Sequence, residues 1–268
     1  MIRSMYSGVA GLKNHQVKMD VIGNNIANVN TIGFKASRVV FQDIYSQTTK
    51  QASTPNVAGG TNPQQVGMGV AIGSIDVLHT RSAAQFTGAP LDVMIEGDGF
   101  FVVNNGSNNF FTRAGNFYTD QNNNLVDSSG NYVQQLGDTA GTTKDIKITD
   151  GYYDISIDKN GSIVGINNLT KAKDVIATIC IAQFNNQNSL EKMGENLYIN
   201  NSNTGVPNYL NPGILGAPYI NPGALEMSNV DLSKEFTDMI VTQRGFQANS
   251  RVITTSDSLL EELVNLKR

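Results

Sequence analysis

The sequence contains a single cysteine, no tryptophan and only two histidines. Cys180 has no partner with which to form an internal disulfide or a thiolate metal site. It lies in the apolar run Val175–Ile181, where a small buried side chain is the expected role. His15 and His79 are too far apart in the sequence to form a metal-binding pair on one helix. We therefore predict no metal, no cofactor and no disulfide framework.

Charged residues and long apolar runs are also scarce. Charged residues make up 16% of the chain, the net charge is −4 and the pI is about 5.2. No basic cluster offers a surface for nucleic acid or for an anionic membrane. No segment approaches the roughly 18 apolar residues of a membrane-spanning helix, and the first residues lack the apolar core of a signal peptide. Nucleic acid and membrane are therefore not expected partners. The composition alone predicts a cytosolic protein or one exported without a leader.

The two ends of the chain carry apolar residues at helical spacing. Between Ile2 and Val29 they recur every three or four residues, and the same steps continue over more than four heptads after Leu232. The C-terminal series, seven of whose ten members are apolar, is Leu232, Phe236, Met239, Gln243, Phe246, Ser250, Ile253, Asp257, Leu260 and Val264. This pattern predicts a coiled-coil-like seam, with Asn229 or Asp231 as the residue that caps the helix. Neither helix has enough apolar surface for a core of its own, so we expect the two helices to pack against each other or against further copies.

The middle of the chain has a different pattern. Short apolar runs such as Phe100–Val103 are divided by turn residues, and Ile155–Val164 has an Asn-Gly pair at the centre of a hairpin. We therefore predict an α+β protein with paired N- and C-terminal helices, coiled-coil-like, and a central mostly-β domain. The expected domains are a helical assembly domain built from 1–45 and 225–268, a polar linker or long loop at 46–65, and a β-rich outer domain at 66–224.

Two loops resemble ligand-binding motifs but lack their defining residues. Gly67–Gly73 is rich in glycine, yet no Lys-Ser or Lys-Thr pair closes it and no helix pattern follows, so nucleotide binding is not predicted. Asp120–Asn124 begins like a calcium-binding loop, but Leu125 occupies the position that requires glycine and Asn131 the position that requires glutamate. We interpret both segments as turns of the β domain.

Two alternative functions remain open from the residues alone. Asp92 and Glu96 lie on the same side of a predicted strand, as the paired carboxylates of a β-rich hydrolase would. The segment Glu96–Gly99 is typical of a solvated hairpin turn, which favours a structural role. Tyr152 and Tyr153 would serve a carbohydrate- or surface-binding β module if they formed an exposed patch, although such a module has no need of long paired helices. We therefore expect that the protein is not an enzyme.

Several ordered segments resemble one protein family. Met19–Lys35 resembles the N-terminal signature of bacterial flagellar axial proteins. Leu225–Leu232 and Gln243–Ser250 are similar to the C-terminal signature of the flagellar hook and rod proteins. Leu91–Phe101 and Phe111–Phe117 fit the middle of the same family. The chain therefore resembles the flagellar hook and rod proteins, and within that family it is most similar to the hook subunits.

This resemblance implies a structural subunit that polymerises into a helical tube. As a hook subunit the protein would form a flexible joint that links rod and filament. The alternative is a distal rod subunit of the basal body, whose length is about that of this chain. The implied partners are further copies of the chain, other flagellar axial proteins at each end of the polymer, and the flagellar export apparatus. The implied location is the flagellum, in its hook or basal body, reached without a cleaved signal peptide.

We expect the self-assembly interface to combine apolar residues of both helices with the asparagines near the end of the first helix. Asparagine readily adopts turn conformations, and its side chain can bridge neighbouring backbones. The predicted interface residues are Met5, Val9, Leu12, Asn24, Asn25, Asn28, Phe34, Leu232, Phe236, Phe246, Ile253 and Leu260.

Overall fold

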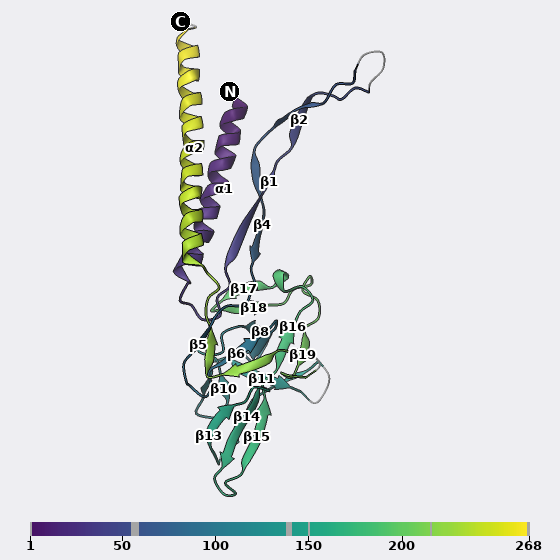
Figure 1. The fold of residues 1–268 in the computed structure, drawn as a ribbon, viewed down its shortest axis with the longest axis vertical. Coiled ribbons are helices and arrows are strands. Elements are labelled where there is room, and N and C mark those ends of the chain that lie inside the picture. Colours follow the sequence, from purple (N-terminus) through teal and green to yellow (C-terminus); the bar gives the residue numbers. More distant parts are fainter. Residues whose placement is uncertain (1, 55–58, 138–140, 150, 215, 267–268) are drawn as a thin grey trace. The chain divides into compact units, whose positions relative to one another are not determined.

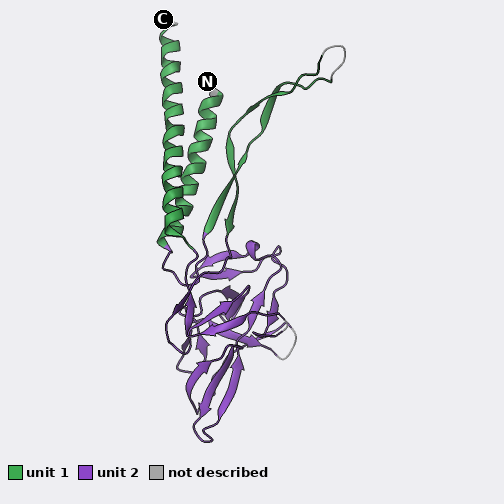
Figure 2. Cartoon of the chain, viewed as in Figure 1, with its two compact units in different colours: residues 1–27, 37–77, 230–268 green, residues 28–36, 78–229 purple. Residues whose placement is uncertain are grey.

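The structure, a computed structural model, describes residues 2–54, 59–137, 141–149, 151–214 and 216–266. The chain forms two compact units, which Figure 2 distinguishes by colour. The helical unit contains residues 1–27, 37–77 and 230–268, and the β unit contains residues 28–36 and 78–229. The chain therefore passes between the units four times. The segment that follows the N-terminal helix and the segment that precedes the C-terminal helix both belong to the β unit. The predicted boundaries at 45 and 225 do not coincide with this division.

The helical unit contains two long helices, α1 (Ile2–Ala27) and α2 (Leu232–Asn265), which Figure 1 shows side by side. The Asp231 side chain accepts hydrogen bonds from the backbone N–H groups of Ser233 and Lys234. Asp231 is thus the N-cap of α2, as one of the two sequence alternatives predicted. The prediction of an N-terminal helix, a C-terminal helix and a mostly-β body between them is confirmed.

A long antiparallel arm completes the helical unit. Its strands are β1 (Ser37–Asp43), β2 (Ser46–Lys50), β3 (Gln64–Gly67) and β4 (Val70–Val77). β1 pairs with β4, and β2 pairs with β3. The predicted linker at 46–65 therefore contains β2 and the first residues of β3. Its sequence shows no apolar alternation because every residue of β2 and β3 is exposed, so neither face of the ribbon has a core to bury.

The β unit is built from antiparallel sheets. Its elements are β5 (Ala84–Phe86), β6 (Val93–Glu96), β7 (Phe100–Asn104), β8 (Asn109–Thr112), β9 (Tyr118–Thr119), β10 (Leu125–Val126), β11 (Tyr132–Leu136), β12 (Thr143–Asp145), β13 (Tyr152–Ile157), β14 (Ser162–Asn167), β15 (Lys173–Thr178), β16 (Ile181–Gln183), the short 3-10 helix η1 (Gln187–Ser189), β17 (Glu191–Gly194), β18 (Leu197–Ile199), β19 (Asn208–Leu210), β20 (Tyr219–Pro222) and β21 (Ala224–Glu226). The largest sheet has the order β17-β18-β8-β7-β11-β10-β9, with β12, β16 and β19 paired to its members. A separate sheet has the order β13-β14-β15, and two smaller ones pair β20 with β6 and β21 with β5.

The strand β7 explains why the sequence shows four apolar residues in succession. Phe101 and Val103 contribute to one buried cluster, and Phe100 and Val102 contribute to another. Because successive side chains of a strand point to opposite faces, a strand with a core on each face requires apolar residues throughout. The run Phe100–Val103 is therefore the signature of a central strand rather than of a half-buried one.

Two turns of the β unit agree with their sequence signals and a third does not. β13 and β14 form the predicted hairpin, and Gly161 at its turn has a φ of +68° that favours glycine. Asp120–Asn124 is a turn between β9 and β10, closed by a hydrogen bond from the Asp120 N–H to the Asn124 carbonyl at 2.9 Å. Residues Glu96–Gly99 were predicted to form a hairpin turn, which is wrong because β6 and β7 belong to different sheets.

Candidate assembly interface

The helices α1 and α2 pack against each other in opposite directions. Near the C-terminal end of α1, Asn25 Nδ2 donates to Glu235 Oε1 of α2 at 3.2 Å. Near its N-terminal end, a Cβ added to Gly8 would lie 3.3 Å from Ile253 Cγ1. The early part of one helix thus faces the late part of the other, which defines an antiparallel pair.

Glycines and polar side chains form the seam between these helices. A Cβ added to Gly11 would lie 2.6 Å from Asn249 Nδ2, and one added to Gly245 would lie 2.7 Å from the His15 ring. Close approach at these positions requires glycine. The residues that α2 buries are Thr242 and Ser256. Of the predicted heptad, Ile253 contacts α1 at Gly8, but the residues that pack most closely between the helices are small or polar, so the predicted coiled-coil pairing is not confirmed.

His15 packs at a junction of three elements. It lies on α1 against Gly245 of α2, and its ring meets the ring of Phe41 on β1 edge-on, with 5.9 Å between centroids. Burial lowers the pKa of His15, and the positive charge of Lys18 lowers it further. Both effects favour the neutral form of the imidazole, which packs between the three elements.

The apolar residues predicted for the assembly interface divide into two groups. Val9 is 39% exposed, Leu232 is 39% exposed and Phe236 is 50% exposed. Those that are partly buried within one copy are Met5, Leu12, Phe246, Ile253 and Leu260. The first group is free to meet a neighbouring molecule, whereas Ile253 already contacts α1 at Gly8.

The asparagines predicted for the interface have different surroundings. Asn24 is exposed, whereas Asn25 is only 1% exposed and bonds within its own copy. In the β unit, Asn28 Oδ1 accepts a hydrogen bond from the hydroxyl of Thr31 at 3.1 Å. The ring of Phe34 faces Lys192 Nζ, 4.8 Å from the centroid. The structure thus assigns intrachain roles to three of these residues, and their contact with another copy stays a prediction.

Both helices expose more apolar residues than the heptad series indicated. The further exposed ones are Tyr6, Ile240, Val241, Val252, Leu259 and Leu263. Several lie on the side of α2 away from α1, because the α1-facing side is occupied by residues such as Thr242 and Asn249. α2 is apolar on two sides, and α1 covers only one of them. The exposed side is therefore expected to be covered by another protein molecule.

The last turns of α2 continue past the start of α1, as Figure 1 shows. The antiparallel register places the first residue of α1 opposite the turn that precedes Leu259. We call residues 259–265 the C-terminal overhang. Leu260 and Leu263 lie at the spacing that continues the α1-facing side, yet Leu263 is 50% exposed. Within the described residues of one copy, the overhang therefore presents an apolar stripe that extends beyond α1 and is only partly buried.

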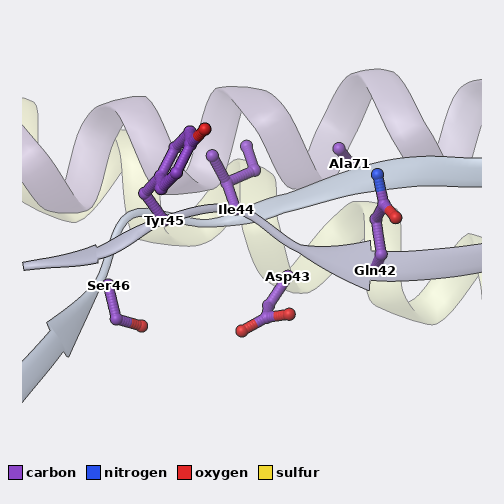
Figure 3. Close-up of a pocket in the computed structure, with 6 residues that line it drawn as sticks. All are labelled: Gln42, Asp43, Ile44, Tyr45, Ser46 and Ala71. Atoms are coloured by element: carbon purple, nitrogen blue, oxygen red, sulfur yellow. The ribbon is translucent and has the colours of Figure 1, made fainter.

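The arm adds an open hollow of about 490 Å³ at the bend between β1 and β2. Figure 3 shows Ile44 and Tyr45 on one side of the ribbon, and Asp43 and Ser46 on the other. The arm is joined to α1 by the side chain of Asn14, which donates to the carbonyl of Val70. The residues that line the hollow form no constellation of catalytic groups.

The residues weighed for chemistry do not come together as a site. Among the described residues, no three histidine, cysteine or acidic side chains are placed to hold a metal ion. Cys180 is fully buried, and burial raises the pKa of its thiol to about 12. Asp92 accepts a hydrogen bond from the hydroxyl of Thr87, and Glu96 is exposed at the end of β6.

Tyr152 and Tyr153 do not form a shared aromatic patch. They are neighbours on β13 and therefore face opposite sides of the sheet. Tyr152 packs close to Gly165, whereas Tyr153 is 46% exposed. This geometry removes the support for a carbohydrate-binding module. Within the described residues, no helix is long and apolar enough to cross a membrane.

Comparison with protein families gives three matches that follow the chain in order. Residues 5–35 match the family described as flagella basal body rod protein. Residues 94–165 match the flagellar hook protein FlgE/F/G D1 domain. Residues 221–266 match the flagellar basal body rod FlgEFG protein C-terminal family. The matches include both helices and part of the β unit.

Individual relatives cover the chain completely. The flagellar basal-body rod protein FlgG of Bacillus subtilis (strain 168) is 49% identical over 270 residues, which span 100% of both chains. The flagellar hook protein FlgE of Borreliella burgdorferi is 31% identical over 442 residues, and that of Treponema pallidum is 29% identical over 464 residues. Each of these alignments also spans 100% of both chains.

Proposed function

Because this chain belongs to the family of flagellar rod and hook proteins, we propose that it is a subunit of the distal rod of the flagellar basal body. The observation that carries this proposal is the 49% identity to a basal-body rod protein over the full length of both chains. The hook relatives are less similar, and their alignments extend over 442 and 464 residues, against 268 residues here. They therefore contain sequence without a counterpart in this chain. These comparisons favour the rod alternative over the hook function that the sequence first suggested.

The subunit acts as a structural component, and we assign its assembly to the exposed apolar faces of α1 and α2. Fully burying a Leu, Val or Phe side chain stabilises a contact by about 1.5–3 kcal/mol, so a few such residues in each neighbour suffice for a strong interface. A contact between different faces of identical copies generates a helical polymer when the rotation between copies does not close a ring. Exposed residues on the outer side of α2, such as Phe236 and Ile240, support this arrangement.

The C-terminal overhang extends the same packing from one copy to the next. Its stripe of Leu260 and Leu263 continues the surface with which α2 covers α1. In the polymer, the overhang lies on a helix of a neighbouring copy, which supplies the partner that its own α1 is too short to provide. The acidic residues Glu261 and Glu262 flank this stripe and suit basic side chains such as Arg3 on a neighbour.

Substitution in the overhang tests the assembly surface. Leu263→Asp places a charge where apolar burial is required and should strongly reduce polymer formation, measured by sedimentation and negative-stain microscopy. Ser258→Asp is the matched control, because it adds the same charge at an exposed position five residues earlier on α2. Normal polymers from Leu263→Asp, with the control also normal, would contradict the assignment of the overhang.

Location is tested by immunogold labelling of isolated hook–basal bodies with antibody to the β unit. Label restricted to the rod is the expected result. Label along the curved hook would favour the hook function instead.

Family membership also supports partners beyond further copies. We include other flagellar axial proteins at each end of the polymer and the flagellar export apparatus, with export that removes no signal peptide. Mass analysis of the protein recovered from basal bodies should find the first residues of α1 intact. A shortened N-terminus would contradict that part of the proposal.

A further inference from the structure

The β unit buries three ionisable side chains at one point. Lys35 is fully buried, and Arg113 and Glu226 are each 1% exposed. Lys35 Nζ lies 2.7 Å from Glu226 Oε1, and Arg113 Nη1 lies 3.4 Å from Glu226 Oε2. A single carboxylate therefore serves two cations, one at each oxygen. We call Lys35, Arg113 and Glu226 the charge triad.

Each member of the triad comes from a different part of the sequence. Lys35 lies between α1 and β1, Arg113 follows β8, and Glu226 ends β21. They also fall in three separate family matches, at residues 5–35, 94–165 and 221–266. The triad is thus a point at which the N-terminal, central and C-terminal segments of the β unit meet.

Hydrogen bonds fix each charge from its own side. Lys35 Nζ also donates to the carbonyl of Thr80 at 2.7 Å, and Arg113 Nη1 donates to the carbonyl of Gly97 at 2.9 Å. The guanidinium of Arg113 lies over the ring of Phe100, 5.0 Å from its centroid. Glu226 Oε1 additionally accepts from the backbone N–H of Ser82 at 3.2 Å. The carboxylate is therefore the shared element, and each cation has independent support.

The backbone near the triad depends on the same three segments. The N–H of Gly33 donates to the carbonyl of Glu226 at 2.8 Å. Gly33 has a φ of +70°, and a Cβ there would lie 2.7 Å from the backbone nitrogen of Ala114. The segment 28–36 is therefore packed directly on the backbone beside Arg113 and is bonded to β21. Its position requires both of these partners.

Electrostatics makes Glu226 the decisive member. Burial lowers the pKa of Lys35 and of Arg113, and in both cases the charge of Glu226 opposes that effect. Without this carboxylate, two like charges would remain close together in a desolvated site, and an uncompensated buried charge is strongly destabilising. Asp98 also favours both charged forms, but it is exposed and therefore screened by water.

We propose that the charge triad couples docking of the N-terminal segment 28–36 to the C-terminal segment. In this proposal, Glu226 permits residues 28–36 to dock on the rest of the β unit. Until β21 is in place, Lys35 and Arg113 repel each other and residues 28–36 stay undocked. Lys35 is eight residues from the end of α1, and Glu226 is six residues from the start of α2. The links to both helices are therefore anchored at one point only in the complete chain. This inference rests on the triad and goes beyond the proposed place in the rod.

Lys35 provides its own reporter for the test. Trypsin cleaves after lysine, and a docked segment protects the Lys35–Ala36 bond. In the full-length protein, Glu226→Gln should accelerate cleavage after Lys35 on the order of a hundredfold, because the segment opens while its charge is unpaired. The fully buried Cys180 should remain unreactive to alkylating reagents, which shows that the core of the β unit stays folded. Asp98→Asn is the matched control, since it removes an exposed carboxylate near the same cations.

Two results would contradict the proposal that docking of residues 28–36 depends on Glu226. One is a protected Lys35 in Glu226→Gln with Cys180 also protected. The other comes from a double-mutant cycle with Lys35→Gln, measured by urea unfolding, and it applies even if Glu226→Gln unfolds the whole unit. Removing one cation should partly rescue Glu226→Gln, so the double variant should be clearly more stable than the sum of the single effects predicts. Additive effects would show that the two charges are not coupled.

Discussion

The side chain of Asn25 exchanges two hydrogen bonds with the backbone of Ser37. Asn25 Nδ2 donates to the Ser37 carbonyl at 2.8 Å, and the Ser37 N–H donates to Asn25 Oδ1 at 3.0 Å. The same amide donates to Glu235 at the start of α2. One buried asparagine on α1 therefore bonds to the first residue of β1 and to α2, and it organises the helical unit within a single copy.

Replacement of this asparagine should weaken the helical unit. Asn25→Ala removes three hydrogen bonds, including both that join this side chain to the backbone of Ser37, so we expect a loss of about 2–3 kcal/mol in the free energy of unfolding. Urea unfolding followed by far-UV circular dichroism measures this loss. Gln16→Ala, at an exposed position of the same helix, is the control and should change stability by less than about 0.5 kcal/mol. Equal effects of the two substitutions would show that the Asn25 bonds contribute nothing.

Two glycines of the helices should respond in opposite ways to the same change. The Cβ that Gly245→Ala adds would lie only 2.7 Å from the His15 ring, so the ring must move. We expect destabilisation of about 1–3 kcal/mol. Gly23→Ala meets no atom within 4 Å and should instead stabilise α1 by about 1 kcal/mol. Thermal unfolding of both variants checks the difference in sign. Stabilisation by Gly245→Ala would mean that the helices do not approach closely at His15.

Local features of the fold could be predicted from the sequence, because neighbouring residues decide them. The Asn-Gly pair at Asn160 specifies the β13–β14 hairpin, and Asp231 provides an acceptor for the first N–H groups of α2. Each of these signals acts within a few residues, so no knowledge of the tertiary structure is needed.

The seam and the triad could not be predicted in this way. A glycine in a helix pattern indicates only a weaker helix, and Gly245 gains its meaning from His15, which is distant in the sequence. Lys35 and Glu226 are separated by 191 positions, and each is typical of an exposed residue by composition. The heptad series has a related limit, because it identifies an apolar stripe but not the molecule that covers it.

Cys180 should be chemically inert in the folded protein. Its thiol is fully buried, and burial raises its pKa to about 12, so the reactive thiolate is scarce at neutral pH. We expect no alkylation by iodoacetamide in native protein and complete alkylation in denaturant, measured by intact mass. Rapid alkylation of the native protein would show that the cluster around Cys180 opens readily.

His79 should make the β unit sensitive to acid. Its ring packs edge-on against the rings of Phe100 and Tyr198. Burial, followed by the positive charges of Arg113, Lys35 and Lys192, lowers its pKa from 6.5 to about 4. The unfolded chain therefore binds a proton near pH 6.5, whereas the folded protein does not do so until about pH 4.

The contribution of His79 to stability is accordingly constant above pH 6.5 and declines as the pH falls from 6.5 to about 4. In that window the unfolded state binds more protons, so the free energy of unfolding decreases, by at most about 3 kcal/mol in total. His79→Phe keeps an aromatic ring but removes the titration. Urea unfolding of both proteins between pH 4 and pH 8 measures the difference, since the carboxylates and His15 affect both profiles alike. Burial and repulsion by three cations act on the pKa of His79 in the same direction, so the two profiles of unfolding free energy must diverge below pH 6.5. Parallel profiles would place His79 in a solvated environment, which the packed aromatic rings exclude.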